Sequence, residues 1–246
     1  RRETIAKMLG ELERRFPGSG IGRIPQEPEA IDLLTGTFGC TVVAGIFGMP
    51  VLFSENGWPT TGAEYLSVRQ IEELEAPDLD ESTFFGGLMA QVDEIGEIQG
   101  RVVGFMNWQG ILNNAQRLRG PELFMDLIDK PELCRHLFDC ICRTMIDGME
   151  RLQARQRATG VDYRFATISN CCVNMISPSQ YAELIMPYDK RIAERFDVIG
   201  IHNCAWNADP YLEHYAEFGN LGYIDMGLES NLGRARKLMG NARRAL

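Results

Sequence analysis

Short apolar runs alternate with segments of helical period along the chain. Polar or glycine-rich turns bound these runs, which is the pattern of parallel β/α units. The predicted strands occupy residues 40–47, 101–105, 163–168, 198–201 and 221–225, with a further candidate at residues 50–53. No glycine-serine linker, low-complexity tract or internal repeat divides the sequence, so we expect a single α/β domain over residues 1–246.

Three helices between these runs have recognisable ends. The longest is predicted from residue 130 to about residue 158, because Pro131 suits a first helical position and apolar residues follow at spacings of three and four. Another begins at Ser177, where Gln180 stands three residues later and completes a predicted capping box. A third is expected to begin near Asp209.

The number of strands bears on the fold class. Five or six predicted strands do not reach the eight that close a TIM barrel. The expected fold is therefore a TIM (β/α)8-type barrel that lacks its C-terminal β/α unit or units in this chain. Such a barrel would expose the edge of the strand at residues 221–225, and exposed edges pair with other chains. We therefore expect a homo-oligomer.

Charge and cysteine usage narrow the class of protein. The chain has 25 Lys and Arg against 34 Asp and Glu, a formal charge of −9, so it lacks the positive field that binds nucleic acids. No apolar stretch is long enough for a membrane span, and the polar start at residues 1–4 does not resemble a signal peptide. Seven cysteines without regular spacing do not form a secreted disulfide framework. These features favour a cytoplasmic protein that acts on a small molecule.

The segment His202-Asn203-Cys204 follows the apolar run at residues 198–201. Residues two apart on a strand point to the same side, and the carboxyl ends of parallel strands are where ligand sites form. His202 and Cys204 could therefore supply two ligands to a tetrahedral zinc ion. Cys171 and Cys172 follow the strand at residues 163–168, so either could be a third ligand. The alternative is that these are hydrogen-bonded or packing residues of loops.

Other polar and aromatic residues also follow predicted strands. We expect a substrate pocket lined by Asn107, Trp108, Gln109, Asn170, Trp206 and Asp225. Trp108 and Trp206 are candidates for a flat wall against a ring. The sequence has no Gly-x-Ser-x-Gly elbow and no phosphate-binding P-loop, which argues against a serine hydrolase and a P-loop NTPase.

Several short blocks occur in a characteristic order. They are Leu-Arg-Gly-Pro-Glu at 118–122, Leu-Ile-Asp-Lys-Pro-Glu at 127–132, Ile-Ser-Pro-Ser-Gln-Tyr at 176–181, Met-Pro-Tyr at 186–188 and Gly-Ile-His-Asn-Cys at 200–204. In this order they resemble the uroporphyrinogen decarboxylase superfamily, which includes zinc-dependent methyltransferases that act with corrinoid proteins. The resemblance spans roughly residues 30–246 and implies a TIM barrel.

The resemblance also implies roles for residues. A His-x-Cys after a late barrel strand is the zinc signature of the methyltransferases, so His202 and Cys204 inherit ligand roles. The family's third ligand is a cysteine further along, beyond Leu246, and the resemblance therefore leaves the part of Cys171 and Cys172 open. The implied reaction is zinc-dependent methyl transfer between a corrinoid-bound methyl group and a thiol or other small acceptor, with the corrinoid supplied by a partner protein.

Two alternatives remain from the sequence. The decarboxylase branch relies on an arginine-rich N-terminal motif, which is absent here, and on a Phe-Ser-Asp motif, where this chain has Phe53-Ser54-Glu55. Arg23 is isolated, and a substrate with many carboxylates needs several placed cations. A porphyrinogen decarboxylase therefore ranks second. The third reading is a barrel that binds a ligand without catalysis, or a fragment.

Overall fold

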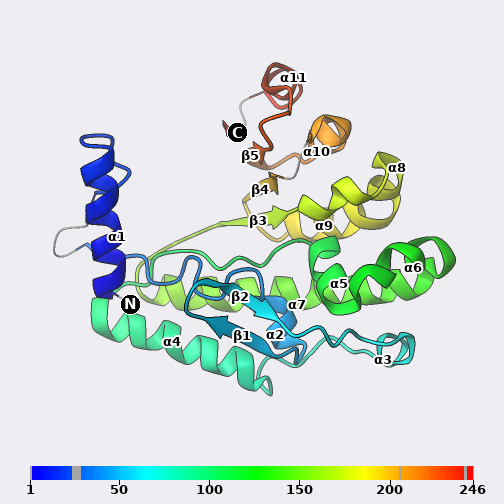
Figure 1. Cartoon of the computed structure of the whole chain (residues 1–246), viewed down its shortest axis with the longest axis horizontal. Coiled ribbons are helices and arrows are strands. Elements are labelled where there is room, and N and C mark those ends of the chain that lie inside the picture. Colours follow the sequence, from blue (N-terminus) through cyan, green and yellow to red (C-terminus); the bar gives the residue numbers. More distant parts are fainter. Residues whose placement is uncertain (1, 24–28, 205–206, 241–242, 246) are drawn as a thin grey trace.

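Four parallel strands form the main sheet of the computed structural model, which describes residues 2–23, 29–204, 207–240 and 243–245. The strands are β3 (Phe165–Ser169), β4 (Val198–Asn203), β5 (Leu221–Met226) and β6 (Arg243–Ala245), and they pair in that order. Helices connect each strand to the next (Figure 1). The connecting helices are α8 (Pro178–Gln180), α9 (Met186–Ala193), α10 (Leu212–Tyr215) and α11 (Leu232–Leu238). This repeated β/α connectivity is that of a TIM-barrel-like α/β fold.

Helices dominate the chain before β3. They are α1 (Arg2–Arg15), α2 (Val42–Ile46), α3 (Val68–Glu72), α4 (Thr83–Gln99), α5 (Ile111–Arg119), α6 (Leu123–Asp129) and α7 (Pro131–Ala158). A separate antiparallel hairpin is made by β1 (Val51–Ser54) and β2 (Gly57–Thr61). Single 3-10 turns cover Gly120–Glu122, Cys171–Met175 and Asp209–Tyr211, and a π-helical turn covers Tyr181–Ile185. None of the described helices is long and apolar enough to cross a membrane.

The longest helix organises the core. Helix α7 has the predicted bounds, and it packs against α3, α4, α5, α6 and α9. Its buried face includes Leu137, Ile141, Met145, Met149 and Leu152, which recur at the predicted spacings of three and four. Figure 1 shows α4 and α7 lying side by side below β3, and the two helices pack against each other.

Of the five main strand predictions, three are confirmed and two are wrong, those at residues 40–47 and 101–105. The runs at 163–168, 198–201 and 221–225 form β3, β4 and β5. The run at 40–47 forms helix α2 instead, because a short helix buried on all sides has no polar stripe and its sequence resembles that of a buried strand. The candidate at 50–53 does lie in a strand, β1, but in the hairpin and outside the parallel sheet.

Residues 101–105 form no strand and pair with none of the described strands. Their backbone hydrogen bonds go to side chains: Val102 N–H donates to Thr159 Oγ1 at 2.9 Å, and the Gln156 amide donates to the Gly104 carbonyl at 2.9 Å. Gly104 has a φ of 108°, which takes the chain out of the strand conformation. With these groups already bonded and the backbone turned, no strand ladder forms here.

The edge of β5 is covered. Strand β6 pairs with it in parallel, with Tyr223 opposite Arg243 and Asp225 opposite Ala245. The expectation that residues 221–225 would form a free edge is therefore wrong, because residues at the C-terminus extend the sheet. Self-association loses this basis and stays a prediction.

The helix that begins at Ser177 offers a test of local stability. Ser177 Oγ accepts a hydrogen bond from Gln180 N–H at 3.2 Å, and Gln180 Oε1 accepts one from Ser177 N–H at 2.9 Å, so the predicted capping box is confirmed. We expect Ser177→Ala to lower the free energy of unfolding by about 1 kcal/mol, because a helix-end N–H loses its partner. Urea unfolding measures this, with Ser177→Thr as the variant that retains the cap. Equal stability of Ser177→Ala and the parent would contradict the prediction.

Candidate metal centre and adjoining pocket

The carboxyl ends of three neighbouring strands place polar residues at one level. Ser169 of β3 pairs in register with His202 of β4, and His202 pairs with Asp225 of β5. Side chains at paired positions of parallel strands point to the same face of the sheet, so these three lie next to one another. This is the end of the sheet at which α/β barrels form their sites.

Cys171, His202 and Cys204 come together at this level. One ligand atom from each lies within 4.8 Å of the others, and the two sulfur atoms are 3.5 Å apart. Cys204 follows the end of β4, and Cys171 begins the turn after β3. The structure therefore brings the predicted pair together with one of the two further cysteines.

Cys172 does not join this cluster. Its backbone N–H donates to Asn113 Oδ1 at 2.9 Å, and its side chain packs against the core. Burial raises the pKa of the Cys172 thiol to about 11, which keeps it protonated near neutral pH. The two adjacent cysteines thus have different surroundings, and Cys171 is the one close to His202.

Asp225 lies behind the imidazole of His202. Nδ1 of His202 is 2.7 Å from Oδ1 of Asp225, which is an ion-pair distance, although the contact lacks the angle of a hydrogen bond. Oδ1 is buried and has no hydrogen-bond partner among the described residues. Because Nδ1 faces the carboxylate, Nε2 is the ring nitrogen left for a metal. Metal-ligating histidines commonly have a carboxylate behind the ring in this way.

The neighbouring groups shift the pKa values of His202, Cys171 and Cys204. The carboxylate of Asp225, and then Cys171, raise the pKa of His202 to about 11. Burial acts to raise the pKa of Cys171, but His202, through a hydrogen bond and its charge, and Cys204, through hydrogen bonds, together bring that pKa below its ordinary value. Burial and the neighbouring Cys171 sulfur raise the pKa of Cys204. Of the two sulfurs, Cys171 is therefore the one that loses its proton more readily.

The donor set fits a zinc ion. Two sulfurs and one imidazole nitrogen are a ligand combination that zinc takes in catalytic sites, with a fourth position left for a water or substrate. Bonds of about 2.0–2.3 Å in a tetrahedron separate ligand atoms by roughly 3.3–3.8 Å. The Cys171–Cys204 sulfur distance of 3.5 Å falls in this range, and the whole set lies within 4.8 Å, so only small side-chain movements are needed.

A pocket of about 690 Å³ adjoins His202 and Asp225. Of the residues predicted to line it, Asn107, Trp108 and Asp225 do so. Gln109 and Asn170 are not among its lining residues: the Gln109 amide bonds to Asn107 and Asn113, and Asn170 is fully buried beneath the sheet end. Trp206 lies outside the described residues.

Sequence reasoning did not identify most of the pocket wall. Five aromatic side chains line it, and four of these were not expected: Trp58, Phe105, Phe165 and Tyr223. The two-residue period of strands could have identified two of them, because Phe165 shares a face of β3 with Ser169, and Tyr223 shares a face of β5 with Asp225. No local signal points to Trp58, which comes from the hairpin.

A buried polar network supports the turn that carries Cys171. Asn170 donates from Nδ2 to Asp189 Oδ2 at 2.8 Å, and the Tyr181 hydroxyl donates to the same oxygen at 3.0 Å. The Asn170 N–H donates to the carbonyl of His202 at 2.6 Å, which joins this turn to β4. Sequence reasoning also missed Asp189, since it lies inside a helical pattern. The network fixes the backbone on both sides of the cluster.

Parallel β/α units with a polar cluster and a pocket at the carboxyl ends of their strands define an α/β protein of TIM-barrel type. The family model of uroporphyrinogen decarboxylase (URO-D) matches residues 26–245. The chain belongs to this family, as the sequence blocks predict.

Comparison with solved structures supports the fold. A methyltransferase from Methanosarcina mazei superposes with a TM-score of 0.70 at 19% sequence identity, over 99% of this chain and 68% of that chain. At this identity the similarity establishes a shared fold. No curated protein sequence matches the chain.

Proposed function

We propose that the chain carries the zinc site of a methyltransferase, which transfers a methyl group between a corrinoid held by a partner protein and a thiol or other small acceptor. The observation that carries this proposal is the Cys171, His202 and Cys204 cluster with Asp225 behind the imidazole. The similarity in fold to a protein named as a methyltransferase is consistent with it.

The chain's own residues have distinct parts in this function. Cys171, Cys204 and Nε2 of His202 would hold zinc, which when bound supplies a Lewis acid that keeps a thiol deprotonated at neutral pH. Asp225 faces Nδ1 of His202 and would hold that nitrogen protonated, so that a metal would displace the proton of Nε2 and bind there. The largely apolar pocket beside them would receive the acceptor.

The decarboxylase alternative receives no support from the pocket. Uroporphyrinogen carries many carboxylates, and their burial requires cationic partners. Among the described residues that line the pocket, none is Lys or Arg. We therefore keep methyl transfer as the proposed function.

Zinc analysis of cysteine variants tests the site. We expect about one zinc per chain in the parent protein and less than about 0.1 in Cys171→Ser and Cys204→Ser, because two ligands hold zinc poorly. Cys172→Ser is the matched control, since it changes the adjacent thiol, and it should retain zinc. Equal zinc contents in Cys171→Ser and Cys172→Ser would contradict the assignment of Cys171.

An activity assay tests the reaction. Purified protein with free methylcobalamin and a small thiol should lose the absorbance of the methylated corrinoid, and Cys204→Ser should not. A chelator should stop the reaction and added zinc restore it. Loss of CO₂ from uroporphyrinogen that a chelator does not affect would favour the decarboxylase instead.

A further inference from the structure

The register of the sheet places Cys171 and Cys204 across from each other. Ser169 of β3 pairs with His202 of β4, and each cysteine stands two residues further along its own segment. The hydrogen bonding continues past this pair, since Asn170 N–H donates to the His202 carbonyl at 2.6 Å. Neighbouring strands lie about 4.8 Å apart, which is within the Cα separation of about 4.4–6.8 Å that a disulfide bridges. The position of the two residues therefore suits a disulfide between neighbouring strand ends.

The two sulfur atoms are close together and accessible. They lie 3.5 Å apart, and a disulfide bond is about 2.05 Å long, so they have to approach by about 1.5 Å. Cys171 begins a 3-10 turn and Cys204 follows the last residue of β4, so neither residue is held inside a strand. Cys204 is exposed and Cys171 is half-buried, so a small oxidant can reach both.

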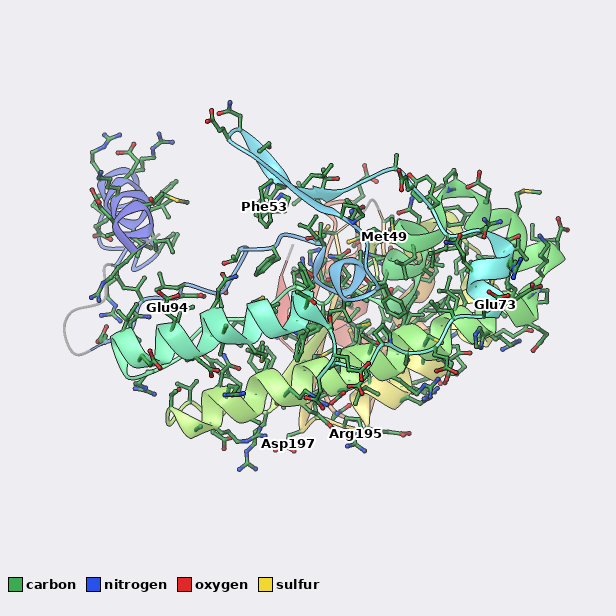
Figure 2. All side chains as sticks on the ribbon, turned by 90° about the horizontal axis from the view of Figure 1, so that it is seen from below. Met49, Phe53, Glu73, Glu94, Arg195 and Asp197 are labelled. Carbon is green, nitrogen blue, oxygen red and sulfur yellow. The ribbon has the colours of Figure 1, made fainter. Side chains whose placement is uncertain are left out.

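The strand that leads to Cys204 is anchored at its other end. Arg195, three residues before β4, pairs with Glu150 of α7 at 2.7 Å. Figure 2 labels Arg195 and shows it beside this helix. We therefore expect the two sulfurs to meet by local movement at Cys171 and Cys204, with the amino end of β4 held against α7.

The other five cysteines have different surroundings. Three are buried in α7, namely Cys134, Cys140 and Cys142. Cys172 packs against the core, and Cys40 accepts a hydrogen bond from the Asn107 amide at 3.5 Å. A close contact between two sulfur atoms and access from solvent are thus combined at Cys171 and Cys204.

We propose that Cys171 and Cys204 are an oxidation site, at which a peroxide converts the two thiols into a disulfide that cannot bind zinc. One thiolate attacks an oxygen of hydrogen peroxide, the O–O bond breaks with loss of hydroxide, and the sulfur becomes a sulfenic acid. The second thiolate attacks this sulfur, so that the S–S bond forms and a second hydroxide leaves. The two hydroxide ions take up the two thiol protons. Two thiols are thus oxidised to one disulfide, and the peroxide is reduced to two water molecules.

Oxidation and metal binding compete for the same sulfur atoms. The thiolate is the form that binds a metal, so the disulfide leaves His202 as the one remaining ligand of the cluster. Zinc held by both thiolates would in turn keep them from the peroxide. The inference deepens the proposed function, because control of zinc binding rests on that function. Closure of the disulfide rests on the geometry of the two thiols.

Peptide mapping of the full chain tests the disulfide. Metal is removed with a chelator, hydrogen peroxide is added, and the remaining thiols are alkylated before digestion with trypsin. We expect the parent to lose two of its seven thiols and to link peptides 165–190 and 196–234. Cys172→Ser should give the same link and Cys171→Ser should give none, since both cysteines lie in one peptide. Unlinked peptides in the parent, or a link in Cys171→Ser, would overturn the proposal.

A second arm of the experiment adds zinc. In the zinc-loaded parent the disulfide should form at least about 10-fold more slowly, because the thiolates are engaged by the metal. Each disulfide that forms should release one zinc ion to a chromophoric chelator, and a reducing agent should restore zinc binding. In His202→Ala, which keeps both sulfurs and lacks the third ligand, zinc should slow the reaction by about 3-fold or less.

The two arms separate this inference from the proposed function. A link between Cys171 and Cys204 in a chain that binds no zinc would retain the oxidation site while the proposed function failed. Loss of zinc under peroxide without the link would overturn the oxidation site and leave the zinc assignment in place. Equal rates of disulfide formation with and without bound zinc would overturn the control of zinc binding by oxidation.

Discussion

Removing the carboxylate of Asp225 is expected to weaken zinc binding by about 10- to 100-fold, the usual effect of losing the group that orients a ligating histidine. Asp225 lies 2.7 Å from His202 Nδ1 and does not itself reach the sulfur cluster. Asp225→Ala loses both the charge and the orienting oxygen. Asp225→Asn keeps an oxygen for Nδ1–H and loses only the charge, so its effect should be the smaller of the two. Competition with a chromophoric chelator measures both affinities.

Tyr223→Phe is the matched control for this prediction. Tyr223 lines the same pocket from the same strand, and its hydroxyl bonds to Thr167 and makes no contact with the cluster. Zinc affinity should therefore be unchanged in Tyr223→Phe. If Asp225→Ala bound zinc as tightly as the parent, the carboxylate would have no part in holding His202 for a metal.

The elements predicted best are those whose signals are local. Helix α7 has a proline at its first position and an unbroken apolar stripe, and each signal depends only on nearby residues. The run at 40–47 gave no such periodic signal, because every residue of α2 is buried. Residues 101–105 fail as a strand for a tertiary reason, since the partners of their backbone are side chains of Thr159 and Gln156.

The site could be predicted where strand geometry determines it. The two-residue period places His202 and Cys204 on one side, and their ligand atoms do lie close together. The choice between Cys171 and Cys172 could not be made in this way. Asn170, with φ −105° and ψ 36°, ends the extended conformation, so strand alternation no longer tells which neighbour faces the site.

The direction of that turn depends on a residue far along the chain. Asn170 is held by Asp189 of α9, and its N–H is held by the carbonyl of His202. Asp189 is fully buried, and among the described residues its carboxylate has amide and phenol partners but no cation. Burial therefore raises its pKa to about 7, against which the two hydrogen bonds act only in part. The group that positions the Cys171 turn is thus itself sensitive to pH.

This burial predicts a pH-dependent effect of Asp189→Asn on stability. The folded-state pKa of about 7 lies above the unfolded value of 3.8, so between these values the folded protein holds a proton that the unfolded chain has lost. The contribution of Asp189 to the stability of the parent should therefore be fully present below about pH 4 and be lost as the pH rises to about 7, by at most about 4 kcal/mol.

Asparagine at position 189 keeps an oxygen for Asn170 and Tyr181 but cannot ionise. Relative to the parent, Asp189→Asn should therefore gain stability from about pH 4 to about pH 7 and no further above that, whatever other groups contribute to both proteins. Urea unfolding at each pH measures the difference. Tyr181→Phe is the matched control, because it removes one hydrogen bond and retains the carboxyl group, so its pH profile should keep the slope of the parent. A constant difference between Asp189→Asn and the parent across this range would show that Asp189 does not titrate there, and the turn would then be held by a carboxylate that stays charged inside the protein.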